Sequence, residues 1–442
     1  MVYNRKNHVA LEEKMNTWQI INLVLTIIVS LLVAYQVLYV IIGLFWKKKF
    51  KDTNVESSYG VLIAGRNEEK VIGQLIDSIK KQNYNQDKIK IFVVADNCSR
   101  NDKTAEIARK MGAVVFERQD KEKVGKGYAL DFLLSKINEN YPDYDPDGWF
   151  VFDADNILDV NYVKEMNKAF NSGGGNIITS YRASKNFGNG LFAMGASIGF
   201  IRDCRFLHTP RTILNISTVV TGTGFLMPKR LINPKTGWKY SCIVEDSEFS
   251  MDVIGKGEKI IYCDDAIFYD EQPETWKATY RQRMRWQKGA YLIYKGFAGS
   301  MILKFFSKFS FTIYDNLIYF TPVPIISTSW ALLNGFIAVV TSFLKMLMGY
   351  PVGIEILSLI GALAFYFVML YLGLFLYGSL AVIKDWKRIK ATNKKKFIAM
   401  FAYPIFMISI IPICFIALFS KVEWKPIEHK EAINIEEINK IK

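Results

Sequence analysis

Four runs of apolar residues, each free of charged side chains, constrain the fold of this chain more than any other feature. A helix rises 1.5 Å per residue, so about 20 residues cross a hydrocarbon layer roughly 30 Å thick. We therefore expect four transmembrane helices, at 18–46, 316–344, 356–383 and 397–420. Because proline removes a helical hydrogen bond, the fourth helix could be broken at Pro404 or Pro412.

The remainder of the chain is divided by these helices. A chain of 442 residues exceeds the size at which a single core usually stops growing, so a separate polar domain is expected beside the membrane part. The expected segments are an N-terminal segment at 1–17, a folded polar domain at 52–275, interfacial amphipathic helices at 276–315 and a C-terminal tail at 421–442.

Basic loops indicate the orientation in the membrane. The loop after the first run contains Lys47, Lys48, Lys49 and Lys51. The loop 384–396 is also rich in Lys and Arg, and such loops usually face the cytoplasm. We therefore expect a multi-pass cell-membrane protein with 52–298 in the cytoplasm, and with the tail outside if the fourth run crosses. If that run instead dips and returns, Trp424, Pro426 and His429 lie near the cytoplasmic domain; they are assigned no role.

Charge and cysteine content exclude two other classes of protein. The formal charge is +14, but much of the excess lies beside the apolar runs, where anionic lipids attract Lys and Arg. A nucleic-acid partner is therefore not expected. The five cysteines have no paired metal spacing, and four of them fall in the predicted cytoplasmic region, so neither zinc nor disulfides are indicated.

The polar domain has an alternating strand and helix pattern. Apolar runs predict strands at 59–64, 89–95, 113–116, 149–152 and 176–181, and amphipathic stretches predict helices at 68–80, 103–111 and 127–137. This order predicts an α/β, Rossmann-like parallel sheet, in which ligands bind beyond the carboxyl ends of the strands. Polar residues follow those ends: Glu68, Asp96, Asp153 and Asp155.

Only one of three Asp-x-Asp pairs follows an apolar strand. Asp143, Asp145 and Asp147 lie in a Pro-containing polar stretch that indicates a solvated turn. Asp153 and Asp155 end a strand, where alternation would point both carboxylates to one side and let them hold a hard cation such as Mg²⁺ or Mn²⁺. An ordinary strand-end turn is the alternative.

Two further residues at the same edge of the sheet could contact a ligand. A carboxylate such as Asp96 accepts hydrogen bonds from a ribose or a base, although a turn acid is nearly as good an interpretation. Lys126 stands near an expected helix start, which favours phosphate if the side chain faces the cleft.

Later in the chain an acid pair offers a general base. An acceptor hydroxyl is a poor nucleophile and needs a carboxylate to take its proton, a role that we give to Asp246 of the pair Glu245-Asp246. The alternative is an acidic helix start, because acids favour the positive end of the helix dipole.

A basic aromatic turn precedes the second apolar run. On a helix Gln282, Arg285 and Trp286 share one face, which combines an amide, a phosphate-binding guanidinium and a ring on which a sugar can stack. An interfacial helix with Trp at headgroup depth is the alternative. Gly222-Thr223-Gly224 predicts a tight turn that an acceptor could approach closely.

Taken in order, these motifs resemble the processive branch of glycosyltransferase family 2, which includes the cellulose, chitin and hyaluronan synthases. The resemblance covers about 59–298 and rests on Asp96, Asp153-Ala154-Asp155, Glu245-Asp246 and the Gln-x-x-Arg-Trp element at 282–286. Departures are Val244 in place of Thr, Ala64-Gly65 in place of Pro-Ala, and no Phe-x-Val-Thr-x-Lys gating loop.

The resemblance implies a GT-A fold for the catalytic domain and an inverting single displacement from a UDP-sugar with Mg²⁺ or Mn²⁺. It implies that Asp246 is the catalytic base and that Asp153 and Asp155 hold the metal. The implied nucleotide-sugar site contains Glu68, Asp96, Lys126, Asp153, Arg283 and Arg285. The implied acceptor site contains Gly222, Thr223, Gly224, Glu245, Gln282 and Trp286.

The product implied by the resemblance is a polysaccharide that passes through the transmembrane helices into or across the bilayer. UDP-glucose and a β-1,4 or mixed 1,3;1,4-β-glucan come first. A chitin-type or hyaluronan-type synthase using UDP-N-acetylglucosamine is an alternative, as is a non-processive enzyme that moves one sugar onto a lipid phosphate. A transporter that merely binds nucleotide is the alternative from another class.

Overall fold

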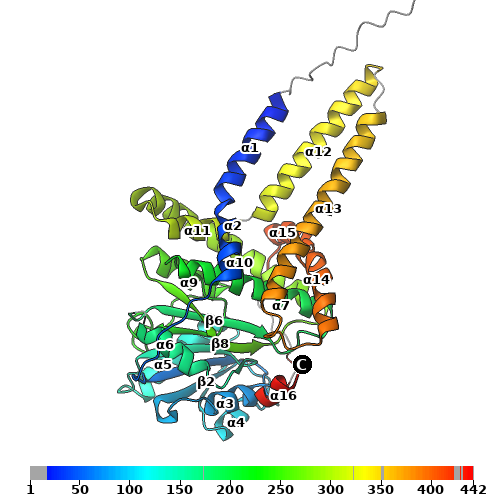
Figure 1. The fold of residues 1–442 in the computed structure, drawn as a ribbon. Helices are drawn as coiled ribbons and strands as arrows, with labels where there is room; N and C mark the ends of the chain where they lie inside the picture. Colours follow the sequence, from blue (N-terminus) through cyan, green and yellow to red (C-terminus); the bar gives the residue numbers. More distant parts are fainter. Residues whose placement is uncertain are drawn as a thin grey trace, which may run out of the picture.

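The computed structural model describes residues 17–172, 174–321, 323–349, 353–422, 429 and 432–441. An α/β domain forms the lower part of the molecule in Figure 1, and long helices rise from its upper side. The two parts are joined through a layer of helices that lies between them.

The α/β domain is built on one eight-stranded sheet of order β3-β2-β1-β4-β7-β6-β8-β5. The strands are β1 (Tyr59–Gly65), β2 (Ile89–Asp96), β3 (Val114–Arg118), β4 (Gly148–Asp153), β5 (Ile157–Leu158), β6 (Ile177–Ser184), β7 (Phe225–Pro228) and β8 (Ile260–Asp270). Strands β3, β2, β1 and β4 run parallel, whereas β7 is antiparallel to both of its neighbours, β4 and β6. The expected strands are present with slightly different ends, and β5, β7 and β8 are additional.

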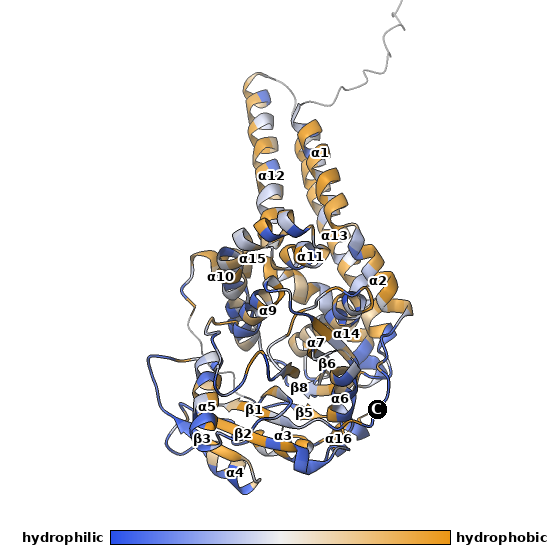
Figure 2. Ribbon diagram, turned by 90° about the vertical axis from the view of Figure 1, so that its left-hand side faces the viewer, coloured by the Kyte–Doolittle hydropathy of each residue, from blue (hydrophilic) through white to orange (hydrophobic). Residues whose placement is uncertain are grey.

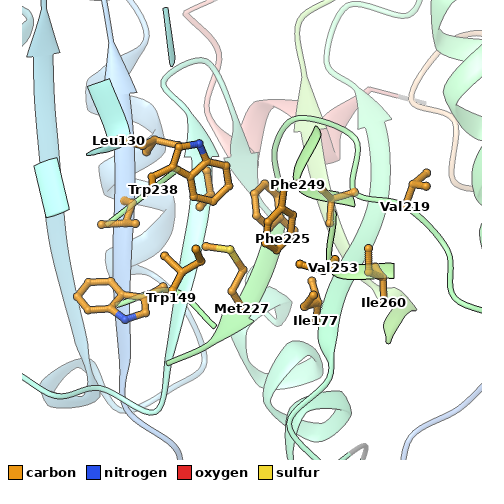
Figure 3. Close-up of a cluster of buried hydrophobic side chains, with 14 of the residues drawn as sticks. Leu130, Trp149, Ile177, Val219, Phe225, Met227, Trp238, Phe249, Val253 and Ile260 are labelled. Carbon is orange, nitrogen blue, oxygen red and sulfur yellow. The ribbon is translucent and has the colours of Figure 1, made fainter. Parts of the chain in front are cut away.

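Helices cover both faces of the sheet. They are α3 (Ile72–Lys80), α4 (Thr104–Lys110), α5 (Lys126–Asn140), α6 (Tyr162–Ser172) and α9 (Glu245–Gly255), with a 3-10 turn, η1, at Gln86–Lys88. Successive residues of a strand pack on opposite faces, as the period of two requires. In β4, Trp149 packs on the side of α5 and α9, and Phe150 packs on the side of α3 and α6. Figure 3 shows part of the first core, with Trp149, Trp238 and Phe249.

The strand order contains a switch point beside β1. The chain moves outward from β1 to β2 and β3, then returns to the other side of β1 as β4. In open sheets of this kind a crevice forms where the order reverses, at the carboxyl ends of the strands. The loops after β1, β2 and β4 are therefore the expected place for a site.

The layer above the sheet contains α7 (Leu191–Asp203), a π-helical turn η2 (Cys204–His208), α8 (Thr209–Ile213), α10 (Trp276–Lys308) and α11 (Phe311–Phe320). The apolar helices are α1 (Thr17–Val33), α2 (Tyr35–Phe45), α12 (Val323–Leu347), α13 (Gly353–Lys384), α14 (Asn393–Ile408) and α15 (Ile410–Phe419). Of these, α1, α12 and α13 rise above the layer, whereas α14 and α15 lie beside it (Figure 1). In Figure 2 most of α1 has the colour of hydrophobic residues, whereas α12 is more mixed.

Four helical segments are long and apolar enough to cross a membrane: Thr17–Phe45, Ile325–Leu347, Ile356–Lys384 and Asn393–Phe419. The second one begins later than the sequence predicts. Residues expected at its start, such as Asn316, belong to the separate helix α11 and are buried against the α/β domain.

The fourth segment is broken at Ser409, and neither Pro404 nor Pro412 is the break itself. A proline cannot donate to the carbonyl four residues earlier, and its ring clashes with that carbonyl. For Pro412 this carbonyl belongs to Ile408, the last residue of α14. The break therefore lies one turn before the proline that causes it.

The C-terminal tail lies on the α/β domain. We expected it outside the cell only if the fourth segment crosses, and beside the polar domain if that segment dips and returns. Helix α16 (Ile435–Lys440) buries Ile435 and Ile438 against Tyr181 and Tyr269, near the lower end of Figure 1. The start of the fourth segment also lies beside this domain, because Lys395 packs on Gly188. Both ends of the fourth segment therefore lie on the side of the α/β domain, as the dip-and-return alternative implies.

Buried ion pairs fix the apolar helices to the α/β domain. The Arg205 guanidinium binds Asp385 at 2.5 Å and Asp264 at 2.9 Å. Asp264 also binds Lys47 at 3.1 Å and Arg388 at 3.0 Å. These residues come from η2, β8, the end of α2 and the end of α13, so one charge cluster ties four elements together.

We predict that Asp385→Ala destabilises the protein by about 3–5 kcal/mol, because it leaves the buried Arg205 charge without its closest partner. The measurement is thermal and denaturant unfolding in detergent. Glu258→Ala is the control, since it removes a surface pair with Arg230 and should cost about 0–1 kcal/mol. Equal losses for the two variants would contradict the anchoring role of the cluster.

Candidate functional site

The site begins at the carboxyl ends of β1, β2 and β4. In the sheet register, Ala64 of β1 pairs with Val94 on one side and with Asp153 on the other. Asp96 lies two residues beyond Val94 at the end of β2. With strands about 4.8 Å apart, Asp96 and Asp153 stand roughly 10–12 Å apart across this edge. That span matches the two ends of a nucleotide.

Asp96 is held in a fixed orientation. The Arg118 guanidinium donates to Asp96 Oδ1 at 2.6 Å, and the Asn97 amide donates to both carboxylate oxygens at 3.2 Å. Asn67, at the end of β1, accepts a hydrogen bond from the Ser99 backbone N–H at 2.8 Å and so connects the loops after β1 and β2. Helix α3 begins only at Ile72, five residues after Asn67.

Lys126 connects the two acidic motifs. Its ammonium, at the start of α5, forms an ion pair with Asp153 and donates to the Gly222 carbonyl at 2.7 Å. Burial alone would lower the pKa of Lys126, but the carboxylates of Asp153 and Glu245 outweigh it and raise that pKa. The buried Lys126 ammonium therefore interacts electrostatically with both acidic motifs, Asp153 and the pair Glu245-Asp246.

The Gly222 turn brings the proposed base next to Lys126. Gly222 has φ +84°, which glycine adopts without strain, and a Cβ there would stand 3.6 Å from Asp246 Oδ2. Gly224 has φ +65°, and a Cβ there would overlap the Phe268 ring at 2.3 Å. The positive φ favours glycine at both positions, and at Gly224 the close approach of Phe268 also excludes a side chain.

Glu245 and Asp246 occupy the first turn of α9. Burial and the neighbouring Asp246 carboxylate raise the pKa of Glu245 to about 7. Burial also raises the pKa of Asp246, while Lys126 and Arg285 oppose that effect. A carboxylate with a raised pKa near a cation is suited to accept a proton at neutral pH.

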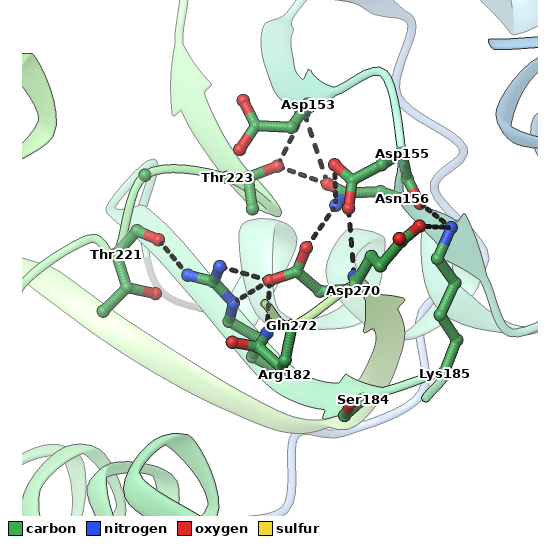
Figure 4. Close-up of polar contacts among 12 residues, drawn as sticks. Asp153, Asp155, Asn156, Arg182, Ser184, Lys185, Thr221, Thr223, Asp270 and Gln272 are labelled. Atoms are coloured by element: carbon green, nitrogen blue, oxygen red, sulfur yellow. Dashed lines mark hydrogen bonds and ion pairs between the residues drawn. The ribbon is translucent and has the colours of Figure 1, made fainter. Parts of the chain in front are cut away.

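Asp153 and Asp155 do not point to the same side, in contrast to the expectation from strand alternation. Strand β4 ends at Asp153, so Asp155 lies in the following turn, where alternation no longer applies. Asp155 accepts a hydrogen bond from the Glu271 backbone N–H at 3.0 Å and is buried. Figure 4 shows Asp155 directed toward Asn156 and Asp270, whereas Asp153 points away from them.

Thr223 is structural in this arrangement. It is fully buried, its hydroxyl accepts from the Asp153 backbone N–H at 2.8 Å, and it donates to the Asn156 side chain. The role of Thr223 in the acceptor site stays a prediction. Its side chain fixes the end of β4 to the Gly222 turn.

Several polar residues of the site were missed by the sequence analysis. They are Arg182, Lys185, Asp270 and Glu271, which join Asp155 in one buried cluster (Figure 4). Burial raises the pKa of Asp270 to about 7 despite its ion pair with Arg182. Asp270 and Glu271 follow an apolar strand, the same signal that identified Asp153, and could have been found from it.

Glu68 and the tail residue His429 complete the acidic end of the site. His429 Nδ1 lies 2.9 Å from Glu68 Oε2. Burial raises the pKa of Glu68, and the carboxylates of Asp155 and Asp153 add to this effect. Burial would lower the pKa of His429, but Asp155 and Glu68 raise it to about 10. No sequence pattern connects positions 68 and 429, so this contact could not be predicted.

The carboxylates of Asp153, Asp155 and Glu68 are of the kind that binds a divalent cation. Among the described residues, however, no group of three or more His, Cys, Asp or Glu has the arrangement of a metal site. Asp153 is the most accessible of the three carboxylates, with 37% of its side chain exposed, against 12% for Glu68 and 2% for Asp155. Carboxylate oxygens are ligands that Mg²⁺ and Mn²⁺ accept. Asp153 is therefore the residue that would hold the ion, with Asp155 and Glu68 supplying negative charge nearby.

The two arginines of the basic aromatic turn on α10, Arg285 and Arg283, have different contacts. Arg285 acts electrostatically on both Glu245 and Asp246, and its Nε is buried with no partner in the described part of the chain. Arg283 faces elsewhere: it donates to the Phe406 carbonyl at 2.6 Å and to Ser409 at 2.7 Å. The expectation that Arg283 binds the donor is therefore corrected, because its guanidinium holds the break between α14 and α15.

The other two residues of the turn lie as follows. Trp286 is partly buried and packs edge-to-face on Phe200, with ring centroids 6.0 Å apart. Gln282, four residues earlier on the same face of α10, is partly exposed.

The chain was compared with known families and proteins. The family model "Glycosyltransferase like family 2" matches residues 57–289, more than half of the chain. "Probable glycosyltransferase YdaM" of Bacillus subtilis (strain 168) is 26% identical over 268 residues, which cover 60% of each protein. The chain thus spans about 60% of the length of this relative. A 4,4'-diaponeurosporenoate glycosyltransferase of Staphylococcus haemolyticus is 37% identical over 89 residues, 19% of this chain and 22% of that protein.

A solved structure has a similar fold. It is the mannosyltransferase PcManGT from Pyrobaculum calidifontis, in complex with GDP-Man and Mn²⁺. The match has a TM-score of 0.52 and 14% identity, and it covers 88% of this chain and 96% of that chain. At this identity the likeness concerns the fold alone, and it agrees with the GT-A architecture expected from the sequence.

Proposed function

This chain belongs to glycosyltransferase-like family 2, and on that premise we propose that it transfers a hexose from a UDP-sugar to a growing polysaccharide, with inversion at the anomeric carbon. The observation that carries the proposal is the position of Lys126. Its ammonium forms an ion pair with Asp153 and donates to the Gly222 carbonyl, and Oδ2 of the proposed base Asp246 lies next to Gly222. A donor site and a base thereby share one cation.

The donor side is assigned to the ends of β1, β2 and β4. Asp96, fixed by Arg118, would accept hydrogen bonds from the nucleoside, and Asp153 would hold Mg²⁺ or Mn²⁺. When bound, that ion would offset negative charge on the diphosphate. Lys126 and Arg285 would bind diphosphate oxygens and stabilise the charge that develops as the bond to the sugar breaks.

The acceptor side is assigned to the Gly222 turn and α10. Asp246 would accept the proton of the acceptor hydroxyl as this oxygen attacks the anomeric carbon, while the UDP leaves on the opposite side. A single base suffices, because inversion requires no covalent intermediate. Trp286 and Gln282 would contact the acceptor sugar, with Trp286 supplying a stacking surface.

The membrane helices support a polymer-exporting function and a cytoplasmic catalytic domain. The basic loops that follow α2 and α13 both lie beside the α/β domain, where Lys47 and Arg388 bind Asp264. Positive loops mark the cytoplasmic side. The acceptor side of the site faces α10, which packs on α15, and α12 and α13 rise beyond it (Figure 1). We infer that the product leaves along these helices.

The product that the protein forms from each UDP-sugar tests the proposed function. Purified protein would be given a panel of UDP-sugars with Mg²⁺, UDP release would be measured, and the product would be digested with linkage-specific hydrolases. We expect UDP-glucose to give a chain that a β-1,4-specific or mixed-linkage glucanase degrades. A chain formed only from UDP-N-acetylglucosamine would indicate the chitin or hyaluronan type. A lipid-soluble monosaccharide would refute polymerisation, and no UDP release with any donor would refute transfer.

Asp246→Asn should lower kcat at least about 100-fold, because the amide cannot take the acceptor proton. The affinity for UDP should stay within about twofold, since Asp246 is assigned to the acceptor. The measurements are UDP release and calorimetric binding of UDP. Activity within tenfold of the parent would remove Asp246 from the role of base.

Gly222→Ala should lower kcat about 10- to 100-fold, because a Cβ at φ +84° would strain the turn whose carbonyl binds Lys126 and which lies next to Asp246. Gly174→Ala is a matched control: Gly174 has φ +66°, but a Cβ there meets nothing within 4 Å. It should unfold at a slightly lower temperature and keep the parent kcat. Equal kcat losses in both variants would indicate a general backbone effect.

A further inference from the structure

Two cations hold the turn that lies next to the proposed base. Lys126 donates to the Gly222 carbonyl at 2.7 Å, and Arg182 Nη1 donates to the Thr221 carbonyl at 2.8 Å. A Cβ on Gly222 would stand 3.6 Å from Asp246 Oδ2, so the same turn borders the base. Two successive carbonyls of this turn are therefore bound by different side chains, one from α5 and one from β6.

The two cations differ in the carboxylates that they face. Lys126 pairs with Asp153, which has 37% of its side chain exposed and to which we assign the metal. Arg182 pairs with Asp270, which has 4% of its side chain exposed, and Arg182 Nε donates to Asp270 Oδ2 at 2.6 Å. A ligand that enters the site can therefore take the Lys126 ammonium from its present partners, whereas burial protects the pair of Arg182 with Asp270.

The carboxylate that holds Arg182 is also linked to the other side of the turn. The Asn156 amide lies 3.5 Å from Asp270 Oδ1, and the Asn156 carbonyl oxygen accepts a hydrogen bond from the Thr223 hydroxyl. Figure 4 shows that these contacts connect both Thr221 and Thr223 to the one carboxylate of Asp270. The turn is thus held by the fold on either side of Gly222, independently of Lys126.

The guanidinium of Arg182 also contacts an aromatic ring. It lies 3.8 Å above the centroid of the Phe200 ring, and Phe200 packs edge-to-face on Trp286. A guanidinium can donate from its edge and stack with its face at the same time, whereas a lysine ammonium has neither the planar face nor the second nitrogen. Arg182 therefore supports, through one rigid group, both the turn beside the base and the ring that contacts Trp286.

We propose that Arg182 is a positioning residue that fixes the acceptor side of the site, while Lys126 is left to bind the donor diphosphate. Arg182 would hold the turn beside the base and, through Phe200, the stacking surface of Trp286. The proposal rests on the proposed glycosyl transfer and adds a residue to the acceptor side of that site. Because the reacting atoms must be aligned for attack, loss of this support should lower kcat more than donor affinity.

The test compares the parent with Arg182→Lys, which keeps the charge and can keep the pair with Asp270. The donor is the one that the parent uses in the UDP-sugar panel, with a short β-glucan oligosaccharide as acceptor. Arg182→Lys should lower kcat about 10- to 100-fold and leave the UDP dissociation constant within about twofold, because the turn is displaced and the donor side is not. UDP release, calorimetric UDP binding and the unfolding temperature are measured.

The matched control is Arg230→Lys. Arg230 is an exposed arginine that pairs with Glu258 on the surface, and this variant should leave kcat and the UDP dissociation constant unchanged.

A double-mutant cycle distinguishes an effect through the turn from a general loss of structure. Gly222→Ala disturbs the same turn, so in that background Arg182→Lys should lower kcat by less than about threefold. Single effects that multiply in the double variant would show that the two residues act independently, and would overturn the proposal.

The outcomes separate the positioning role from the transfer reaction. A folded Arg182→Lys variant with the parent kcat, or with a loss of UDP affinity that matches its loss of kcat, would overturn the role while transfer itself stands. If Arg182→Lys fails to fold, Phe200→Leu tests the stacking contact of the same guanidinium. It should raise the acceptor KM about 3- to 10-fold, and an unchanged KM would overturn the proposal. A parent enzyme that releases no UDP with any donor would overturn both proposals.

Discussion

The arrangement of the whole site depends on one buried ammonium group. Lys126 is the point where the Asp-x-Asp loop, the Gly222 turn and the acid pair of α9 meet, although these segments are separated by long stretches of sequence. A buried cation without anionic partners is costly, so it favours a fold in which the carboxylates surround it. The same charge is suited to hold a diphosphate, and the demands of folding and of ligand binding therefore coincide at this residue.

A second set of charges holds the apolar helices in place. Arg205, Asp264 and Asp385 join the α/β domain to the ends of these helices, and Arg211 with Asp315 joins α8 to α11 in the layer above the sheet. Such pairs are directional, whereas apolar packing between helices in lipid has little hydrophobic driving force. They can fix the orientation of the α/β domain relative to the apolar helices, which the proposed export of the product along those helices requires.

Local patterns in the sequence predicted much of the fold and part of the site. Alternating strands and helices gave the sheet and the positions of Asp96 and Asp153, because strand ends must meet at one edge. These local patterns failed for residues whose position depends on where an element ends or on the tertiary fold. The alternation argument for Asp155 broke down because β4 stops at Asp153. Arg283 and Arg285 are two residues apart, about 200° around a helix, so both could not face one cleft. His429 reaches Glu68 from the far end of the chain, which only the tertiary fold could show.

The most direct test of the account is an experimental structure of the full chain with UDP and Mn²⁺ bound. We expect the nucleoside beside Asp96, the metal on Asp153, and the diphosphate within hydrogen-bond distance of the Lys126 ammonium, with the Asp246 carboxylate facing the β-phosphate across a space the size of one sugar. A nucleotide bound away from Lys126, or an Asp246 carboxylate too distant to share one sugar with it, would contradict the central claim.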